Sequence, residues 1–96
     1  MADTYNNMAI VLRRQGKYDE AMAMYKKALG IKLKTLGEEH SSVADTMYNM
    51  ALLAEKQDNR AAAAGWIGQC RDIYATAYGK DHSETVDAAN QLARVS

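Results

Sequence analysis

Apolar residues recur along the chain with the spacing of an α-helix. Tyr5, Met8 and Leu12 lie on one helical face, and the polar stretch 15–17 interrupts this run. A second run follows at positions 21, 25, 28 and 31 and stops before Gly37. The pattern predicts two helices joined by a short turn.

The same pattern returns forty-two residues further along the chain. Residues 2–43 can be laid over residues 44–85 without a gap, and twelve pairs of positions are then identical. The pairs are Ala2/Ala44, Asp3/Asp45, Thr4/Thr46, Asn7/Asn49, Met8/Met50, Ala9/Ala51, Gln15/Gln57, Ala21/Ala63, Ile31/Ile73, Gly37/Gly79, His40/His82 and Ser41/Ser83. An ungapped match of this kind indicates a repeat array rather than a single globular fold.

The repeat and the periodicity together predict five helices, at residues 3–15, 18–36, 42–57, 60–78 and 83–95. We therefore expect an all-α fold in which antiparallel helix pairs stack as an α-solenoid. The chain is expected to form one array over residues 1–96, with units at 2–43 and 44–85 and a partial third unit at 86–96. Because it starts and ends inside a unit, we expect it to be a section of a longer array.

Small residues recur at fixed places in the two units, where they would let helices approach closely. These positions are Ala9, Ala21 and Ala28 in the first unit and Ala51, Ala63 and Cys70 in the second. The larger neighbours expected to fill the grooves between helices are Tyr5, Met8, Leu12, Tyr25, Met47, Met50 and Ile67. Gly37 and Gly79 are expected to end the second helix of each unit in the left-handed region. Gly65 and Gly68, inside a predicted helix, either permit close packing or soften that helix.

The amino-acid composition disfavours several classes of function. Basic and acidic residues balance at 12 each, which does not favour a nucleic-acid or membrane surface. The single cysteine, Cys70, excludes an internal disulfide, and no stretch has membrane-spanning length. A cytoplasmic protein is the expectation.

The repeat resembles a known family. The tetratricopeptide pattern is W-x2-L-G-x2-Y followed by A-x3-F, with a period of about 34 residues. This chain has Tyr5-x2-Met8-Ala9-x2-Leu12 followed by Ala21-x3-Tyr25. The longer period, the turn at 16–21 and the Leu-Gly-x-x-His linker at 36–40 resemble the kinesin-light-chain type of this repeat. The resemblance covers essentially the whole chain and implies the helix-pair solenoid.

The resemblance also implies a binding surface. In this family the first helix of each unit lines a concave groove that accepts an extended peptide or a partner helix. The residues expected to bind the partner are Asn6, Asn7, Ile10, Arg13, Arg14, Tyr48, Asn49, Leu52, Lys56, Asn90 and Arg94. Asp45, Glu55, Asp87 and Gln91 project to the same side. In similar repeats the asparagine at Asn7 and Asn49 hydrogen-bonds a peptide backbone; the alternative is that both bond neighbouring helices.

Several other residues are compatible with two roles. His40 and His82 lack further ligands at metal spacing, so a helix-capping or packing role is favoured. Cys70 occupies a small core position and is expected to be buried and inert. Trp66 either packs between units or forms an exposed anchor for a partner. The lysines expected on a solvated convex face are Lys26, Lys27, Lys32 and Lys34.

The expected function is a non-catalytic protein-interaction module with no cofactor, because no nucleophile–base set or phosphate loop is present. Another subclass of the family clamps a C-terminal carboxylate with basic residues. Asn6, Ile10, Asp87 and Gln91 lie near the places where those cations belong, so no such clamp is expected. A self-associating repeat fragment is the alternative function, and a docking part of a larger enzyme is a third.

Overall fold

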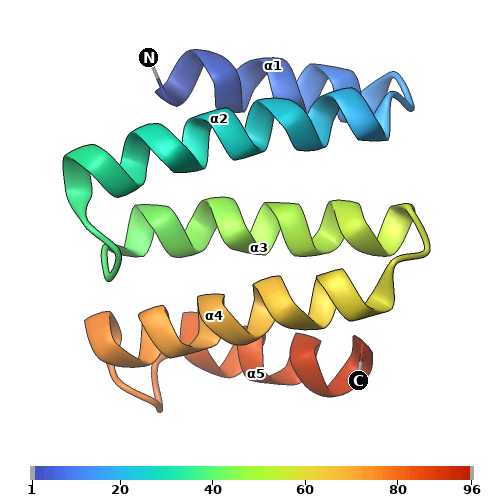
Figure 1. Cartoon of the computed structure of the whole chain (residues 1–96). Coiled ribbons are helices and arrows are strands. Elements are labelled where there is room, and N and C mark those ends of the chain that lie inside the picture. Colours follow the sequence, from blue (N-terminus) through green and yellow to red (C-terminus); the bar gives the residue numbers. More distant parts are fainter. Residues whose placement is uncertain (1, 96) are drawn as a thin grey trace.

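The computed structural model describes residues 2–95 and contains five α-helices and no strand over that range. They are α1 (Ala2–Arg14), α2 (Tyr18–Leu36), α3 (Ser41–Lys56), α4 (Arg60–Tyr78) and α5 (Ser83–Val95) (Figure 1). The all-α prediction is confirmed, and the bounds of α2, α4 and α5 are those expected from the sequence. Helices α1 and α3 each begin and end one residue earlier than predicted.

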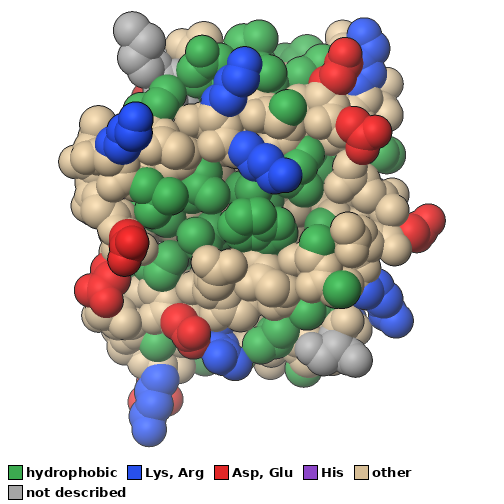
Figure 2. Space-filling model, viewed as in Figure 1, with side chains coloured by type: hydrophobic (Ala, Val, Ile, Leu, Met, Phe, Trp, Pro, Cys, Tyr) green, Lys and Arg blue, Asp and Glu red, His purple; other side chains and the backbone are tan. Residues whose placement is uncertain are grey.

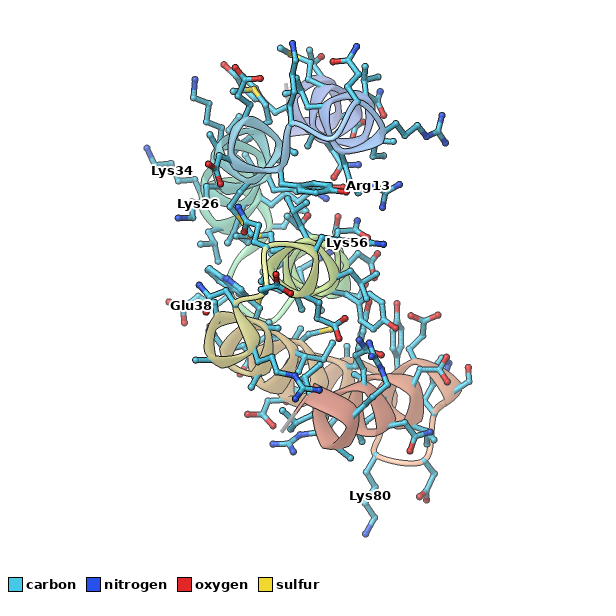
Figure 3. All side chains as sticks on the ribbon, turned by 90° about the vertical axis from the view of Figure 1, so that its right-hand side faces the viewer. Arg13, Lys26, Lys34, Glu38, Lys56 and Lys80 are labelled. Atoms are coloured by element: carbon cyan, nitrogen blue, oxygen red, sulfur yellow. The ribbon has the colours of Figure 1, made fainter. Side chains whose placement is uncertain are left out.

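The helices stack in chain order, with α1, α3 and α5 running in one direction and α2 and α4 returning (Figure 1). Each helix packs against the next, both within the pairs α1/α2 and α3/α4 and between them. Viewed along the helices, α2 and α4 lie on one side of the molecule and α1 and α5 on the other (Figure 3). The stack therefore has an A-helix side, formed by α1, α3 and α5, and a B-helix side, formed by α2 and α4.

The small positions form the contacts between helices. Ala9, Ala21, Ala28, Ala51, Ala63 and Cys70 are all buried, as their recurrence predicts. Tyr25, Met50 and Ile67 fill the space around them and are fully buried. Met8 was expected to do the same, but this prediction is wrong, because its side chain is 46% exposed. Its repeat partner Met50 is buried because the first unit covers it, whereas the described chain places no unit against the outer face of α1.

The glycines Gly37 and Gly79 end α2 and α4 with φ values of +89° and +97°. The positive φ agrees with the prediction, but the left-handed helical conformation does not, because ψ is 168° and 154°. This combination is essentially restricted to glycine. Each glycine N–H still donates to the helix that it ends, to Leu33 and Ala75 respectively. The chain thereby leaves each helix in an extended direction toward the next A helix.

Both histidines cap the helix that follows them. His40 Nδ1 accepts a hydrogen bond from the Ser42 N–H at 3.0 Å, and His82 Nδ1 accepts one from the Glu84 N–H at 3.2 Å. Free N–H groups at a helix start need such acceptors. The predicted capping role is therefore confirmed for His40 and His82.

The B-helix side carries a cluster of hydrophobic side chains near its middle, with charged side chains around it (Figure 2). Lys26 and Lys34 point outward from this side (Figure 3) and are exposed, as is Lys27. The prediction is wrong for Lys32, which is half-buried. Its ammonium group donates to the Ser42 carbonyl at 3.3 Å and to Thr46 Oγ1 at 2.9 Å, and so joins α2 to the next unit.

The glycines inside α4 do not lie against another helix. A Cβ placed at Gly65 or Gly68 would meet no atom within 4 Å beyond the local helix. The two glycines therefore do not permit a close helix approach. Trp66, between them, is half-buried and lines a cavity of about 360 Å³ together with Met22 and Ala23 of α2. It thus lies at the junction of the two units.

None of the described helices is long and apolar enough to cross a membrane.

Candidate interaction groove

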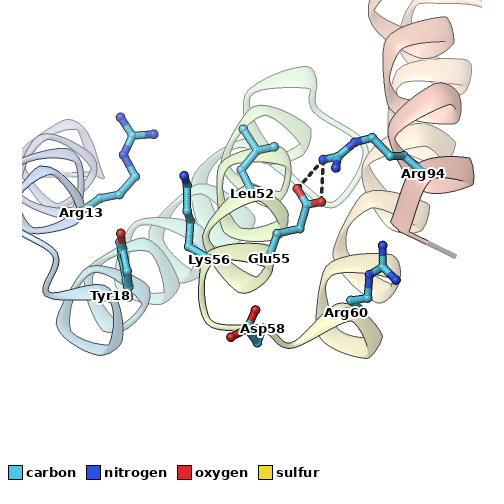
Figure 4. A pocket seen from close by; sticks show the side chains of 8 residues that line it. All are labelled: Arg13, Tyr18, Leu52, Glu55, Lys56, Asp58, Arg60 and Arg94. Carbon is cyan, nitrogen blue, oxygen red and sulfur yellow. Dashed lines mark hydrogen bonds and ion pairs between the residues drawn. The ribbon is translucent and has the colours of Figure 1, made fainter.

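An open cavity of about 850 Å³ lies where α1, α3 and α5 end. We call it the basic cavity; its lining residues are Arg13, Tyr18, Leu52, Glu55, Lys56, Asp58, Arg60 and Arg94 (Figure 4). Basic residues occupy the last turn of all three A helices, where they complement the partial negative charge of a helix C-terminus. The antiparallel stacking brings these helix ends together and so concentrates positive charge in one place.

Only one of these basic residues is neutralised within the cavity. Arg94 Nη2 of α5 contacts both carboxylate oxygens of Glu55 of α3, at 2.5 and 2.8 Å (Figure 4). Gln91 donates to the same carboxylate at 2.7 Å. Among residues 2–95, Arg13, Lys56 and Arg60 form no ion pair. With Asp58 as the other acidic lining residue, the cavity keeps an excess of positive charge.

A second cavity, of about 330 Å³, lies toward the beginning of α3 and α5. We call it the acidic cavity; its lining residues are Asp45, Tyr48, Asn49, Tyr74, Glu84 and Asp87. None of these is basic, and none of the three carboxylates takes part in an ion pair within residues 2–95. This cavity therefore has the opposite charge to the basic cavity.

Tyr74 lines the acidic cavity and is buried. The Tyr74 hydroxyl donates a short hydrogen bond to Asp45. Burial and this bond raise the pKa of Tyr74. Burial raises the pKa of Cys70, which lies behind Tyr74, from 9.0 to about 12, so the thiol stays protonated at neutral pH. The prediction of a buried cysteine is confirmed, and its unreactive thiol takes no part in the site.

Tyr48 lines the acidic cavity and is also affected by charges of the basic cavity. Burial raises its pKa, the carboxylate of Asp87 raises it further, and the guanidinium of Arg94 lowers it. The carboxylate of Glu55, which is paired with Arg94, also raises the pKa of Tyr48.

One face of α3 connects the cavities. Asp45, Tyr48 and Asn49 line the acidic cavity, and Leu52, Glu55 and Lys56 line the basic cavity. The spacing of three or four residues places them on a continuous helical stripe. The side chains of Tyr48, Asn49 and Leu52 are half-buried on this stripe. We call the surface formed by the two cavities and this stripe the groove.

The sequence profile of the tetratricopeptide repeat matches residues 1–76. The chain belongs to the tetratricopeptide repeat family. Such repeats are generally protein-interaction modules, and the family is typically non-enzymatic. None of the curated proteins matches this chain in sequence.

Solved structures with the same fold include kinesin-light-chain-like repeat proteins. The chain is similar to BtubC (BKLC) from P. vanneervenii, with a TM-score of 0.87 and 22% identity over 98% of this chain and 37% of that one. It is also similar to a candidate kinesin light chain with nearly identical TPR-like repeats from Podosopora anserina, with a TM-score of 0.80 and 22% identity over 97% of this chain and 44% of that one. The chain therefore spans less than half the length of either protein.

The tetratricopeptide groove contains part of the residue set expected from the sequence. Arg13, Leu52, Lys56 and Arg94 meet in the basic cavity, while Tyr48 and Asn49 line the acidic one. The remaining five expected residues line neither cavity; they are Asn6, Asn7, Ile10, Arg14 and Asn90. Arg94 is held by Glu55 rather than being free, because the two A helices place a carboxylate beside it.

Asn7 and Asn49 are the two asparagines expected to bind a peptide backbone. Within residues 2–95, neither the Asn7 nor the Asn49 side chain makes a hydrogen bond. Their alternative role, in bonding neighbouring helices, would require such bonds. Asn49 is half-buried in the groove, whereas Asn7 is exposed on α1. Asn49 is therefore the asparagine whose surroundings best suit contact with a ligand.

Sequence reasoning missed three lining residues of the basic cavity, Tyr18, Asp58 and Arg60. Tyr18 and Arg60 are the first residues of α2 and α4 and occupy equivalent positions in the two units. The forty-two-residue offset could have paired them, but only the fold shows that B-helix starts lie beside A-helix ends.

Across residues 2–95, no three His, Cys, Asp or Glu side chains are grouped so as to hold a metal ion.

Proposed function

We propose that this chain is a non-catalytic interaction module that binds a peptide or a partner helix in the groove of its A helices. The observation that carries the proposal is the Asn49 amide, which is half-buried in the lining of the acidic cavity and has no hydrogen-bond partner within residues 2–95. Among the described residues, Tyr25 Oη is the only fully buried side-chain polar atom without a partner, so the Asn49 amide is open to solvent and available to a ligand. A peptide backbone would satisfy both the donor and the acceptor of this amide.

The neighbours of Asn49 supply the remaining parts of a peptide site. Tyr48 and Leu52 are half-buried on the same stripe of α3 and provide apolar contact. Aromatic and apolar side chains beside directed polar groups are the usual composition of a binding hot spot. The proposed contact surface extends over α1 through Asn6, Asn7 and Ile10, and over α5 through Asn90. Arg14 would contact only a partner that reaches past the end of α1.

We infer that residues 1–96 act as one array with units at 2–43, 44–85 and 86–96, and that the protein is cytoplasmic. Its partner would be a protein or a peptide rather than a nucleic acid, because the balanced charge gives no extended basic surface.

Replacing Asn49 with Ala tests the peptide-binding proposal. Peptides would first be selected from a random display library on the wild-type chain, and their affinity measured by isothermal titration calorimetry. We expect Asn49→Ala to weaken binding about tenfold, because two backbone-directed hydrogen bonds are lost. The far-ultraviolet circular dichroism should not change, since the side chain has no internal bond to lose.

The matched control is Gln69→Ala, which removes an exposed amide from α4 on the other side of the molecule. Its affinity for the selected peptides should equal that of the wild type. Equal affinity of Asn49→Ala and the wild type would refute the role assigned to Asn49.

A second function, self-association, is favoured by a different observation. Met8 and Val11 of α1 are 46% and 52% exposed, yet the equivalent Met50 and Leu53 of α3 are fully buried against the first unit. The outer face of α1 therefore has the composition of an interface between units. We propose a second copy of this chain as its partner; open ends of repeat arrays favour such association.

A further inference from the structure

The charges of the groove are separated along α3. Asp45 lies at the acidic cavity and Lys56 at the basic cavity. These residues are eleven positions apart, which corresponds to about 16 Å along a helix. The two cavities are therefore far enough apart for different parts of one ligand to occupy them.

Each end of the groove has charge without an internal counterion. At one end, Asp45, Glu84 and Asp87 form no ion pair within the described chain. At the other end, the carboxylate of Glu55 is already occupied by Arg94 and Gln91. Among residues 2–95, the remaining cations at that end form no ion pair and outnumber its other carboxylate, Asp58; Figure 4 shows Arg13 and Arg60 on opposite sides of Lys56. A single anionic group entering the cavity would lie between them.

We infer that the groove is polarised and binds a partner segment that lies along α3, with a basic group in the acidic cavity and an acidic group in the basic cavity. Tyr48 of the acidic cavity and Leu52 of the basic cavity, which lie on the same stripe of α3, would contact an apolar centre of that segment. An extended chain rises about 3.3 Å per residue, so roughly five residues span the distance between the cavities. This inference rests on the proposed function, and adds to it the charge pattern and the direction of the bound segment.

Charge complementarity determines the direction in which a segment binds more than it determines the affinity. Opposite charges at the two ends favour one orientation and disfavour the reversed one, in which like charges meet. A segment with the same composition but mixed charges cannot satisfy both cavities. The polarised groove therefore predicts discrimination between two peptides that differ only in the order of their residues.

Two synthetic peptides with blocked ends test this prediction. One has the sequence Lys-Lys-Leu-Tyr-Leu-Asp-Asp, and the other has the same residues in the order Lys-Asp-Leu-Tyr-Leu-Lys-Asp. We expect the first peptide to bind about tenfold more tightly by calorimetry, because two favourable charge pairs form at once. Equal affinities would overturn the inference.

Charge reversal at each end gives the second arm of the test. Lys56→Glu and Asp87→Lys should each weaken binding of the first peptide by about threefold to tenfold. Both side chains are exposed, so both variants should fold; Lys56→Glu also places a negative charge at the C-terminal end of α3 and should lower the thermal stability slightly. The matched controls are Lys26→Glu and Glu38→Lys, which make the same charge changes at exposed positions pointing away from the groove (Figure 3) and should leave the affinity unchanged.

A spin label on the basic end of the first peptide reports its direction. In the wild type it should broaden the amide resonances of residues 45–49. The double variant with Lys56→Glu and Asp87→Lys removes most of the charge difference between the two cavities, so broadening of residues 45–49 should become weaker and less confined to that end of α3. Equal broadening at both ends of α3 in the wild type would overturn the polarity but leave the groove as a peptide site. If neither peptide perturbs α3, both the polarity and the proposed function are contradicted.

Discussion

At the scale of single residues, the helices that pack around Cys70 determine the reactivity of its thiol. Its repeat partner is Ala28, and both positions are fully buried where two helices meet. Burial raises the pKa of the thiol to about 12, and the carboxylates of Asp45 and Glu84 act in the same direction. The thiol therefore stays protonated in the folded chain at pH values where an exposed cysteine would react.

The folded chain should protect Cys70 from alkylation. At pH 8.5 we expect iodoacetamide to modify the thiol in denaturing urea and to leave it unmodified in buffer, as measured by intact mass. Because the folded pKa is raised above 9.0, the contribution to stability is complete below pH 9 and is lost as the pH rises toward 12. The urea midpoint should fall over this interval, and by less in Cys70→Ala. Rapid modification without urea would contradict the assignment.

Residue roles repeated in both units could be predicted from the sequence, and roles that depend on a neighbouring unit could not. The two histidines share one linker position, and both cap a helix. Lys32, by contrast, reaches across to Thr46, which no property of its own helix indicates. Met8 was misassigned for the same reason, because its burial depends on a unit that must pack outside α1.

At the scale of elements, α2 and α4 have the same length but different composition. Each contains 19 residues, yet α4 has Gly65 and Gly68 where α2 has Ala23 and Lys26. Neither glycine lies close to another helix. Since glycine carries a high entropic cost in a helix, α4 is expected to be the less stable of the two B helices.

Replacing the glycines of α4 should stabilise the protein. Gly65→Ala and Gly68→Ala are each expected to increase the free energy of unfolding by about 1 kcal/mol, because alanine favours the helix and the added methyl group meets open space. Urea denaturation followed by circular dichroism measures the change. The matched control, Gly37→Ala, should destabilise, since its φ of +89° is strained for alanine. A loss of stability in the α4 variants would contradict the packing described for that helix.

The helices themselves were predictable because their apolar period and their breaks are both visible in the sequence. The extended exit after Gly37 and Gly79 was not, since a glycine at a helix end is compatible with more than one positive-φ conformation. The direction of the linker follows from the need to place the next A helix against the preceding pair.

At the scale of the whole molecule, the stack has an exposed apolar outer face on α1. Met8 and Val11 correspond to positions that the array buries in its second unit. The charged groove lies on the A-helix side, so association through α1 would leave the groove accessible.

Light scattering after size exclusion tests this association. We expect a dimer that forms as the concentration rises, and monomers throughout for a variant with Met8→Lys and Val11→Lys, because charge at both positions opposes burial. Ala23→Lys, an exposed change on α2, should dimerise like the wild type. A wild-type chain that stays monomeric at all concentrations would contradict self-association and leave the groove proposal unaffected.

The position of the proposed groove could be inferred from the repeat and its resemblance, because the A helices follow directly from the pattern. The separation of charge within it could not. The basic cavity depends on Tyr18, Asp58 and Arg60, which approach the A-helix ends only after the pairs have stacked. The pairing of Arg94 with Glu55 likewise joins residues 39 positions apart.

The most direct test of the central claim is a chemical-shift map of the ¹⁵N-labelled chain with a library-selected peptide. The account predicts that the largest amide shifts lie along α3 around Asn49 and Leu52, with smaller shifts on the facing sides of α1 and α5. Shifts confined to α2 and α4, or to the outer face of α1 around Met8 and Val11, would contradict it.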